Sequence, residues 1–268
     1  MKLSDEEWLI LQEDFAYDGK YESCFTLANG YMGTRGTFGS DIQRQTPGTY
    51  IAGIFDKSDA AISQLVNMPY FFGLEFYIDG DKVDYKECSV LEFCRTLDMK
   101  QGALYTKIII RDSKMRITTI EGYRFCSYSD RRLAGMSYIL TPVNYGASIY
   151  VRNVIDACTI NGQQTVWDEC KHYRCIKSRA EDNSPIYLEV NTKENRYTAG
   201  FASTLRVCGS DKNIELRRKA SDLGDKVVQT VEINGKQGKA YTIEKYVAVS
   251  TSRDTSKDSV QKSADDEL

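Results

Sequence analysis

Hydrophobic and polar residues alternate along much of the chain with a period of two, which is the spacing of a β-strand that buries one face. Residues 104–110 are rich in β-branched and aromatic side chains, and after a polar turn at 111–114 the segment 115–120 returns. Further strands are predicted over residues 136–140, 147–154 and 186–190. Because such segments recur while helical spacing is rare, we expect a mainly β protein, a large antiparallel β-sandwich (super-sandwich) with few short helices.

Two dipeptides predict tight hairpins. Asp79-Gly80 separates residues 74–78 from 81–85, and Asn234-Gly235 separates 227–233 from 240–249. Both central residues of a type I′ turn need positive φ, which Asp-Gly and Asn-Gly supply at low cost. We therefore expect each dipeptide to join two paired strands.

Helical signals are few. Ser4-x-x-Glu7 has the form of a capping box, yet the four apolar residues 8–11 that follow suit a buried strand equally well. Residues 59–65 could form one or two helical turns. From residue 250 the chain has almost no apolar side chains, so residues 251–268 are predicted to be a linker or the solvated start of a helix.

The composition is that of a soluble globular protein, with 268 residues, 41% hydrophobic and 27% charged. No Pro/Gly/Ser linker divides it, so one large domain is expected. The net charge of −3 comes from interspersed signs and gives no basic patch for nucleic acid. No apolar run is long enough to span a membrane, and residues 4–7 turn acidic where a secretory signal would be apolar. These features predict a cytoplasmic protein.

Eight cysteines and one histidine limit the chemistry. Without a signal peptide the cysteines are expected to be free thiols. Cys170 and Cys175 bracket His172, but no second pair completes a four-ligand zinc site. His172 lies in a polar stretch and is interpreted as a loop or hairpin residue rather than as a catalytic base.

The most distinctive segment is residues 22–40, which contains Gly30, Gly33, Gly36 and Gly39. It lacks the Lys-Ser/Thr of a phosphate-binding loop and opens no helix of a βαβ unit. It is interpreted as a tight connection between strands that needs positive φ, or as a loop that presents Arg35 to a partner surface. No spacing among the 38 acidic residues singles out a catalytic carboxylate pair.

This segment carries a family resemblance. The pattern Glu22-Ser23-x-Phe25-x-Leu27-x-Asn29-Gly30-Tyr31-x-Gly33-x-Arg35-Gly36 resembles the opening signature of glycoside hydrolase family 65, which includes maltose, trehalose, kojibiose and related disaccharide phosphorylases. Further blocks follow in the family's order at residues 47–56, 65–69, 97–104, 124–127 and 245–254. The similarity covers nearly the whole chain.

The resemblance implies an N-terminal β super-sandwich at residues 1–250 and, at 251–268, the start of a linker to an (α/α)6 barrel. The catalytic Glu and the phosphate-binding residues of the family lie in that barrel, so it implies no catalytic, cofactor or metal residue in this chain. The parent enzyme would catalyse inverting phosphorolysis of an α-glucosyl disaccharide to β-glucose 1-phosphate, with inorganic phosphate as co-substrate and no cofactor. The implied partners are the barrel and a second copy in a homodimer.

Within the resembling blocks, four residues are candidates for the interface or the substrate entrance: Asn29, Tyr31, Arg35 and Tyr50. One alternative is a stand-alone carbohydrate-binding sandwich, which the 11% aromatic content supports, although most aromatics fall in strand patterns typical of packing. Another alternative is a sugar epimerase on a similar sandwich, but that chemistry normally needs more than one histidine.

Overall fold

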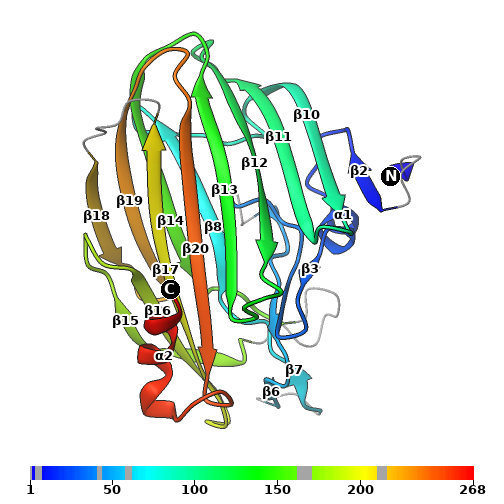
Figure 1. Cartoon of the computed structure of the whole chain (residues 1–268), viewed down its shortest axis with the longest axis vertical. Coiled ribbons are helices and arrows are strands. Elements are labelled where there is room, and N and C mark those ends of the chain that lie inside the picture. Colours follow the sequence, from blue (N-terminus) through cyan, green and yellow to red (C-terminus); the bar gives the residue numbers. More distant parts are fainter. Residues whose placement is uncertain (1, 4–7, 41–43, 58–61, 162–170, 210–215) are drawn as a thin grey trace.

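The computed structural model describes residues 2–3, 8–40, 44–57, 62–161, 171–209 and 216–268. Two antiparallel sheets dominate the fold, which confirms the predicted β-sandwich (Figure 1). The larger sheet has ten strands in the order β1 (Lys2–Leu3), β2 (Leu9–Gln12), β10 (Ser89–Asp98), β11 (Ala103–Arg111), β12 (Ile117–Cys126), β13 (Leu133–Pro142), β20 (Tyr241–Thr251), β17 (Thr198–Gly209), β16 (Ile186–Thr192) and β15 (Tyr173–Arg179).

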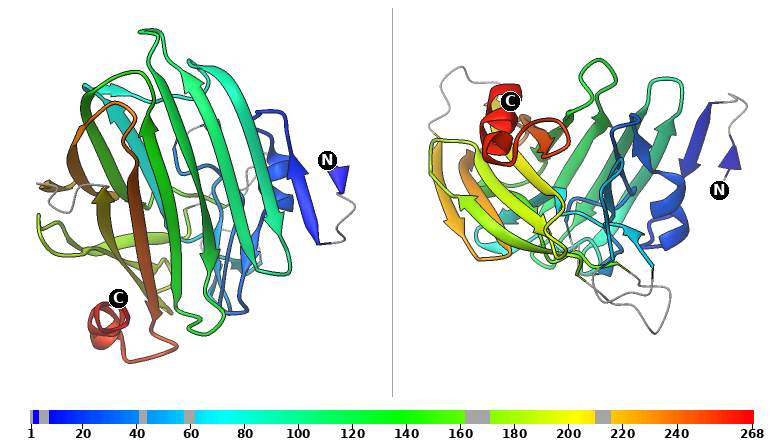
Figure 2. Two further views of the ribbon diagram at one scale, coloured as in Figure 1. Left: turned by 45° about the horizontal axis from the view of Figure 1, so that its top comes forward. Right: turned by 90° about the horizontal axis from the view of Figure 1, so that it is seen from below.

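The smaller sheet has five strands in the order β18 (Arg217–Asp222), β19 (Lys226–Gly235), β14 (Ala147–Asp156), β8 (Tyr70–Ile78) and β9 (Asp81–Lys82). Figure 2 shows it lying against one face of the larger sheet. Alternate residues of each strand enter the layer between the sheets; Ile108 and Ile110 of β11, for example, are buried while Lys107 points outward. The core therefore fills the space between the two sheets, and the opposite face of the larger sheet is the outer face of the sandwich.

Polar contacts also join the two sheets. The buried Nζ of Lys245 on β20 donates to the carbonyls of Gly73 and Val154, at 2.8 and 3.0 Å. Beside it the Ser203 hydroxyl donates to Oδ1 of Asn153 at 3.1 Å. Burial without a neighbouring carboxylate lowers the pKa of Lys245 far below its usual value.

The first predicted hairpin is confirmed. Ile78 pairs with Asp81 across Asp79 and Gly80, whose φ angles are 50° and 86°. The second is wrong: β19 pairs with β14 and β18, whereas β20 pairs with β13 and β17 in the other sheet. Asn234 and Gly235 continue β19 opposite Ser148 and Ala147. The physical reason is packing, because a Cβ on Gly235 would lie 2.5 Å from the side chain of Ile149.

Short elements cover the lower right part of the sandwich in Figure 1, from α1 at mid-height down to β6 and β7. They are a three-stranded sheet of β3 (Leu27–Ala28), β4 (Met32–Thr34) and β5 (Thr49–Ile51), a pair formed by β6 (Phe55–Asp56) and β7 (Gln64–Leu65), and helix α1 (Gly19–Cys24). The N-cap of α1 is Asp18, whose side chain accepts from the Lys20 amide at 2.8 Å. The glycine-rich segment builds most of this part.

Several predictions concern the ends of the chain and its loops. The Ser4–Glu7 pattern and residues 59–61 lie outside the described residues, while Leu9–Gln12 forms strand β2 and Gln64–Leu65 forms strand β7. The polar C-terminal segment forms a short 3-10 helix (Lys257–Ser259) and helix α2 (Val260–Glu267). None of the described helices has the length and apolar character needed to span a bilayer.

Candidate functional site

Four segments that are distant in sequence meet at the lower end of the sandwich, at residues 29–31, 52–54, 127–132 and 251–254. We call them the loop cluster. It includes the turn between β3 and β4, the turn after β5, the connection from β12 to β13 and the end of β20. Most of these segments belong to the blocks that carry the family resemblance. The contacts among them decide what the candidate residues can do.

Asn29 locks two of these segments together. Its Nδ2 donates to the carbonyls of Ser127 and Arg131 at 2.6 and 2.9 Å. Its Oδ1 accepts from the amides of Tyr31 and Met32 at 3.0 and 2.9 Å. The side chain is buried and all of its polar atoms are engaged. Asn29 is therefore a structural residue of the turn, with no group left for a ligand.

Tyr31 joins the same turn to the end of β20. Its hydroxyl donates to Oδ2 of Asp254, and its carbonyl accepts from the Ala52 amide at 2.8 Å. Burial first, and the Asp254 carboxylate second, raise the pKa of Tyr31, so the hydroxyl remains a proton donor. Arg253 adds a further link, because its Nη1 donates to the Ala52 carbonyl at 2.6 Å. The sequence did not indicate that Arg253 and Asp254 would hold these two turns together.

Arg35 is held inside the domain. Its Nη2 lies 3.2 Å from Oε2 of Glu22 and 3.2 Å from the carbonyl of Gly19, both in α1. Its aliphatic part lies over Gly48, where a Cβ would be 2.7 Å from Cδ of Arg35. The guanidinium thus ties α1 to β4 and is neutralised by Glu22, which makes it a poor candidate for a cation presented to a partner.

Tyr50 is the fourth candidate and lies in β5 opposite Gly33. It is half-buried, and its ring packs beside Gly48. The structure therefore places Asn29, Tyr31, Arg35 and Tyr50 in or directly beside one small sheet, and the first three connect it to the β12–β13 connection, to the segment after β20 and to α1.

The glycines of this segment have two roles. Gly30 has a φ of +87° in the turn between β3 and β4, as the predicted tight connection requires. At Gly36 the reason is close approach, since a Cβ there would lie 2.3 Å from Cβ of Phe25. The segment is thus a rigid support rather than a phosphate-binding loop.

Helix α2 lies beside the loop cluster on the outer face of the larger sheet, in contact with β17 and β20 (Figures 1 and 2). Val260 and Ala264 are fully buried. Arg179 of β15 binds both carboxylate oxygens of Asp265 at 2.7 and 2.8 Å, and Arg132 bonds to Ser263 and Glu267. The polar C-terminal segment is thus held by charged groups at its edges and by two small apolar side chains beneath it.

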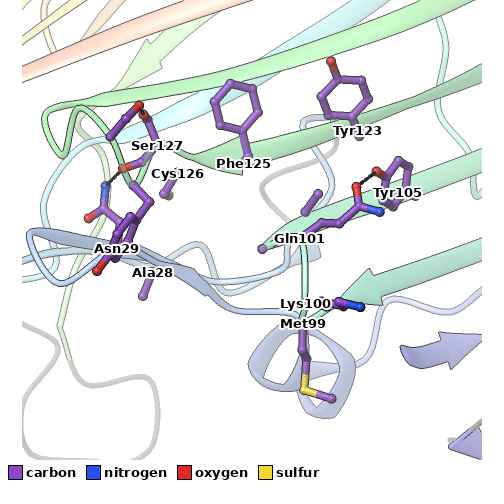
Figure 3. A pocket seen from close by; sticks show the side chains of 14 residues that line it. Ala28, Asn29, Met99, Lys100, Gln101, Tyr105, Tyr123, Phe125, Cys126 and Ser127 are labelled. Atoms are coloured by element: carbon purple, nitrogen blue, oxygen red, sulfur yellow. Dashed lines mark hydrogen bonds between the residues drawn. The ribbon is translucent and has the colours of Figure 1, made fainter. Parts of the chain in front are cut away.

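An open trough of about 830 Å³ adjoins the loop cluster on the outer face of the larger sheet (Figure 3). One wall is the turn between β10 and β11, the floor is formed by β11 and β12, and the other wall is the start of the β12–β13 connection. Its lining residues are Ala28, Asn29, Met99, Lys100, Gln101, Gly102, Ala103, Tyr105, Tyr123, Phe125, Cys126, Ser127, Tyr128 and Ser129. Sequence reasoning missed this site, because it assigned the strand aromatics to packing.

The buried carboxylates of the described residues are paired with other side chains. Each buried carboxylate has a partner: Glu22 with Arg35, Asp56 with His172, Asp156 with Lys226, and Glu189 with Tyr187. No group of three or more His, Cys, Asp or Glu side chains in the described part could hold a metal ion. No carboxylate lines the trough.

His172 and the cysteines complete this account. His172 precedes β15 in a connecting segment, as expected, but it is buried, and its Nδ1 lies 3.3 Å from Oδ2 of Asp56. The polar residues next to it in the sequence predict an exposed side chain, so its burial could not be predicted from the sequence. The seven described cysteines are free, as predicted, while Cys170 lies outside the described residues. Burial raises the pKa of Cys126 and Cys175 to about 12, so neither is a thiolate at neutral pH.

Comparisons with known proteins point to one family. Residues 10–268 match the sequence profile of "Glycosyl hydrolase family 65, N-terminal domain". A kojibiose phosphorylase from Caldanaerobacter subterraneus subsp. tengcongensis is 36% identical, over 99% of this chain and 35% of that protein. An alpha,alpha-trehalose phosphorylase from Thermoanaerobacter brockii is 28% identical, over 93% of this chain and 35% of that protein.

The fold of a solved structure agrees. A putative kojibiose phosphorylase from the human microbiome superimposes with a TM-score of 0.79 and 19% identity, covering 97% of this chain and 35% of that one. The chain therefore spans about a third of the length of the relatives that it matches.

Proposed function

Because the chain belongs to glycosyl hydrolase family 65, as its N-terminal domain, we propose that it is the non-catalytic domain of a longer glycoside phosphorylase. In that enzyme it would support a catalytic (α/α)6 barrel supplied by the remaining two thirds of the relatives' length. The observation that carries the proposal is the combination of a match over residues 10–268 with coverage of only 35% of the relatives. The pairing of the buried carboxylates with other side chains also supports a division of labour between domains.

The loop cluster and helix α2 are the surface that we propose for contact with the barrel. Their segments are linked by side-chain hydrogen bonds of Asn29, Tyr31 and Arg253, so the surface is rigid before any partner binds. A rigid surface loses little conformational entropy on docking, which favours a stable interface between domains. Assembly of the parent enzyme into a homodimer is part of the same proposal.

The reaction proposed for the parent is inverting phosphorolysis of an α-glucosyl disaccharide. A barrel carboxylic acid would protonate the glycosidic oxygen while phosphate attacks the anomeric carbon from the opposite face. Phosphate is already an anionic nucleophile, so no protein base has to activate a water, and no cofactor is needed. The product would be β-glucose 1-phosphate together with the released sugar.

The parent enzyme provides the test of this reaction. Kojibiose, trehalose and maltose are each incubated with the full-length protein and inorganic phosphate, and the products are identified by ³¹P and ¹H NMR. We expect β-glucose 1-phosphate from at least one disaccharide, at a rate that depends on the phosphate concentration. Release of free glucose at a rate independent of phosphate would show a hydrolase instead.

A further inference from the structure

Three aromatic rings form the floor of the trough, with the planes of Tyr105 and Tyr123 at 44°. The ring centroids of Tyr105 and Tyr123 are 5.7 Å apart, and those of Tyr123 and Phe125 are 6.2 Å apart, with the latter planes at 28°. Phe125 lies over bare backbone, because a Cβ on Gly135 would be 3.1 Å from its Cζ. Tyr105 and Tyr123 are 37% and 40% exposed. The three rings form a continuous apolar strip on the outside of the sheet.

Polar groups with fixed positions border this strip. The Tyr105 hydroxyl donates to Oε1 of Gln101 at 3.0 Å, and the backbone N–H of Gln101 donates to Oδ1 of Asp98 at 2.9 Å. This arrangement orients the Gln101 side chain and leaves its Nε2 for an external acceptor. On the other wall the hydroxyls of Ser127 and Ser129 lie 3.3 Å apart. The border therefore offers neutral donors and acceptors.

The low charge of the trough argues against strongly charged ligands. Among its lining residues only Lys100 is charged. A nucleic acid or another polyanion would need several cations, and a basic peptide would need carboxylates. A neutral ligand with alternating apolar faces and hydroxyl edges matches both the strip and its border. Aromatic rings exposed beside polar groups are the usual composition of sites where one surface of the ligand is apolar and its edge is wet.

We propose that this trough binds a short gluco-oligosaccharide, with pyranose faces stacked on Tyr105, Tyr123 and Phe125. Ring hydroxyls would bond to Gln101 and to the serines of the far wall. The site would give this domain a carbohydrate-binding role of its own, in addition to supporting a barrel. The inference does not depend on the reaction proposed for the parent, because the residues that would hold the sugar all belong to this chain.

An NMR titration of the chain with maltotriose tests the proposal, with sorbitol as a polyol that lacks pyranose faces. We expect binding with a Kd on the order of 1 mM and amide shifts centred on residues 99–102 and 126–129. Tyr123→Ala should weaken binding about tenfold, whereas Tyr123→Phe should keep it. Tyr246→Ala is the matched control, since Tyr246 is 39% exposed on the same sheet and does not line the trough.

Three results of the titration would overturn the inference: no shifts at about 20 mM maltotriose, equal shifts with sorbitol, or unchanged affinity in Tyr123→Ala. A circular-dichroism melt of each variant separates loss of the site from loss of the fold. A second measurement addresses the rival occupant, the rest of a longer protein. If tetranitromethane nitrates Tyr123 in this chain but not in the full-length parent, the trough is an internal interface and the sugar site is rejected.

Discussion

Replacing Asn29 by alanine tests whether this residue holds the loop cluster or acts on a ligand. The substitution removes four hydrogen bonds, two donated to the carbonyls of Ser127 and Arg131 and two accepted from the amides of Tyr31 and Met32. Each buried bond contributes about 1 kcal/mol net. Water can satisfy part of the exposed groups, so we expect a loss of about 3 kcal/mol in the free energy of unfolding.

Differential scanning calorimetry and urea unfolding measure this loss. For a domain of this size it corresponds to a fall in Tm of about 6 to 12 °C. Asn144→Ala is a matched control, since Asn144 bonds to Met115 and Ile117 at an exposed site. That control should cost about 1 kcal/mol.

The outcome separates two roles. If Asn29→Ala leaves the free energy of unfolding within about 0.5 kcal/mol of wild type, the hydrogen bonds are not holding the cluster and the structural role is refuted. Asn29→Asp keeps the two accepted hydrogen bonds but places a carboxylate oxygen against the carbonyls of Ser127 and Arg131, so it should destabilise the domain at least as much as Asn29→Ala.

Three further predictions concern other contacts. Gly36→Ala should cost more than about 2 kcal/mol, because its Cβ would collide with Phe25, whereas Gly30→Ala, strained only by its positive φ, should cost about 1 kcal/mol; equal losses in thermal unfolding would contradict the packing argument. Arg179→Ala should speed hydrogen exchange in helix α2 and cost about 1 kcal/mol; unchanged exchange would show that the helix is held otherwise. Burial lowers the pKa of Lys245 in the folded state, so the unfolded chain binds more protons than the folded chain up to a pH of about 10.4. The free energy of unfolding of wild type, relative to that of Lys245→Met, should therefore rise with pH in this range. A difference that does not change with pH would refute this prediction.

The strands could be predicted from the sequence because their alternation is local. Ile108 and Ile110 point into the core and Lys107 points out, as the pattern indicates. The pairing of β19 could not be read in the same way. Asn234-Gly235 is a local hairpin signal, but Gly235 is small because Ile149, far away in the sequence, occupies the space beside it. Local chemistry predicted the strand, and a non-local contact decided its partner.

Helix α2 shows the same limit at the end of the chain. Its composition predicts a solvated segment, yet Val260 and Ala264 are spaced by four residues and bury against the sheet. The segment is held by Arg179 and Arg132, which come from other elements. Only the folded sheet brings these cations to the helix.

The sequence pattern located the turn at Asn29 in the loop cluster, but it did not show what the Asn29 side chain does. The glycine-rich pattern and Asn29 identified the turn correctly, while the inward direction of the Asn29 amide appears only in the structure. The trough depends on register, since Tyr105 and Tyr123 are opposite one another across β11 and β12. The pattern of hydrophobic and polar residues along the sequence does not determine this register. The cytoplasmic location and the homodimer stay predictions.

The most direct test of the central claim is an activity measurement on this chain alone. Purified residues 1–268 are incubated with kojibiose, trehalose or maltose and phosphate, under conditions in which the full-length parent forms glucose 1-phosphate. The account predicts no glucose 1-phosphate above the enzyme-free control, because it assigns the catalytic carboxylic acid to the barrel. Steady, phosphate-dependent turnover by this chain would contradict it.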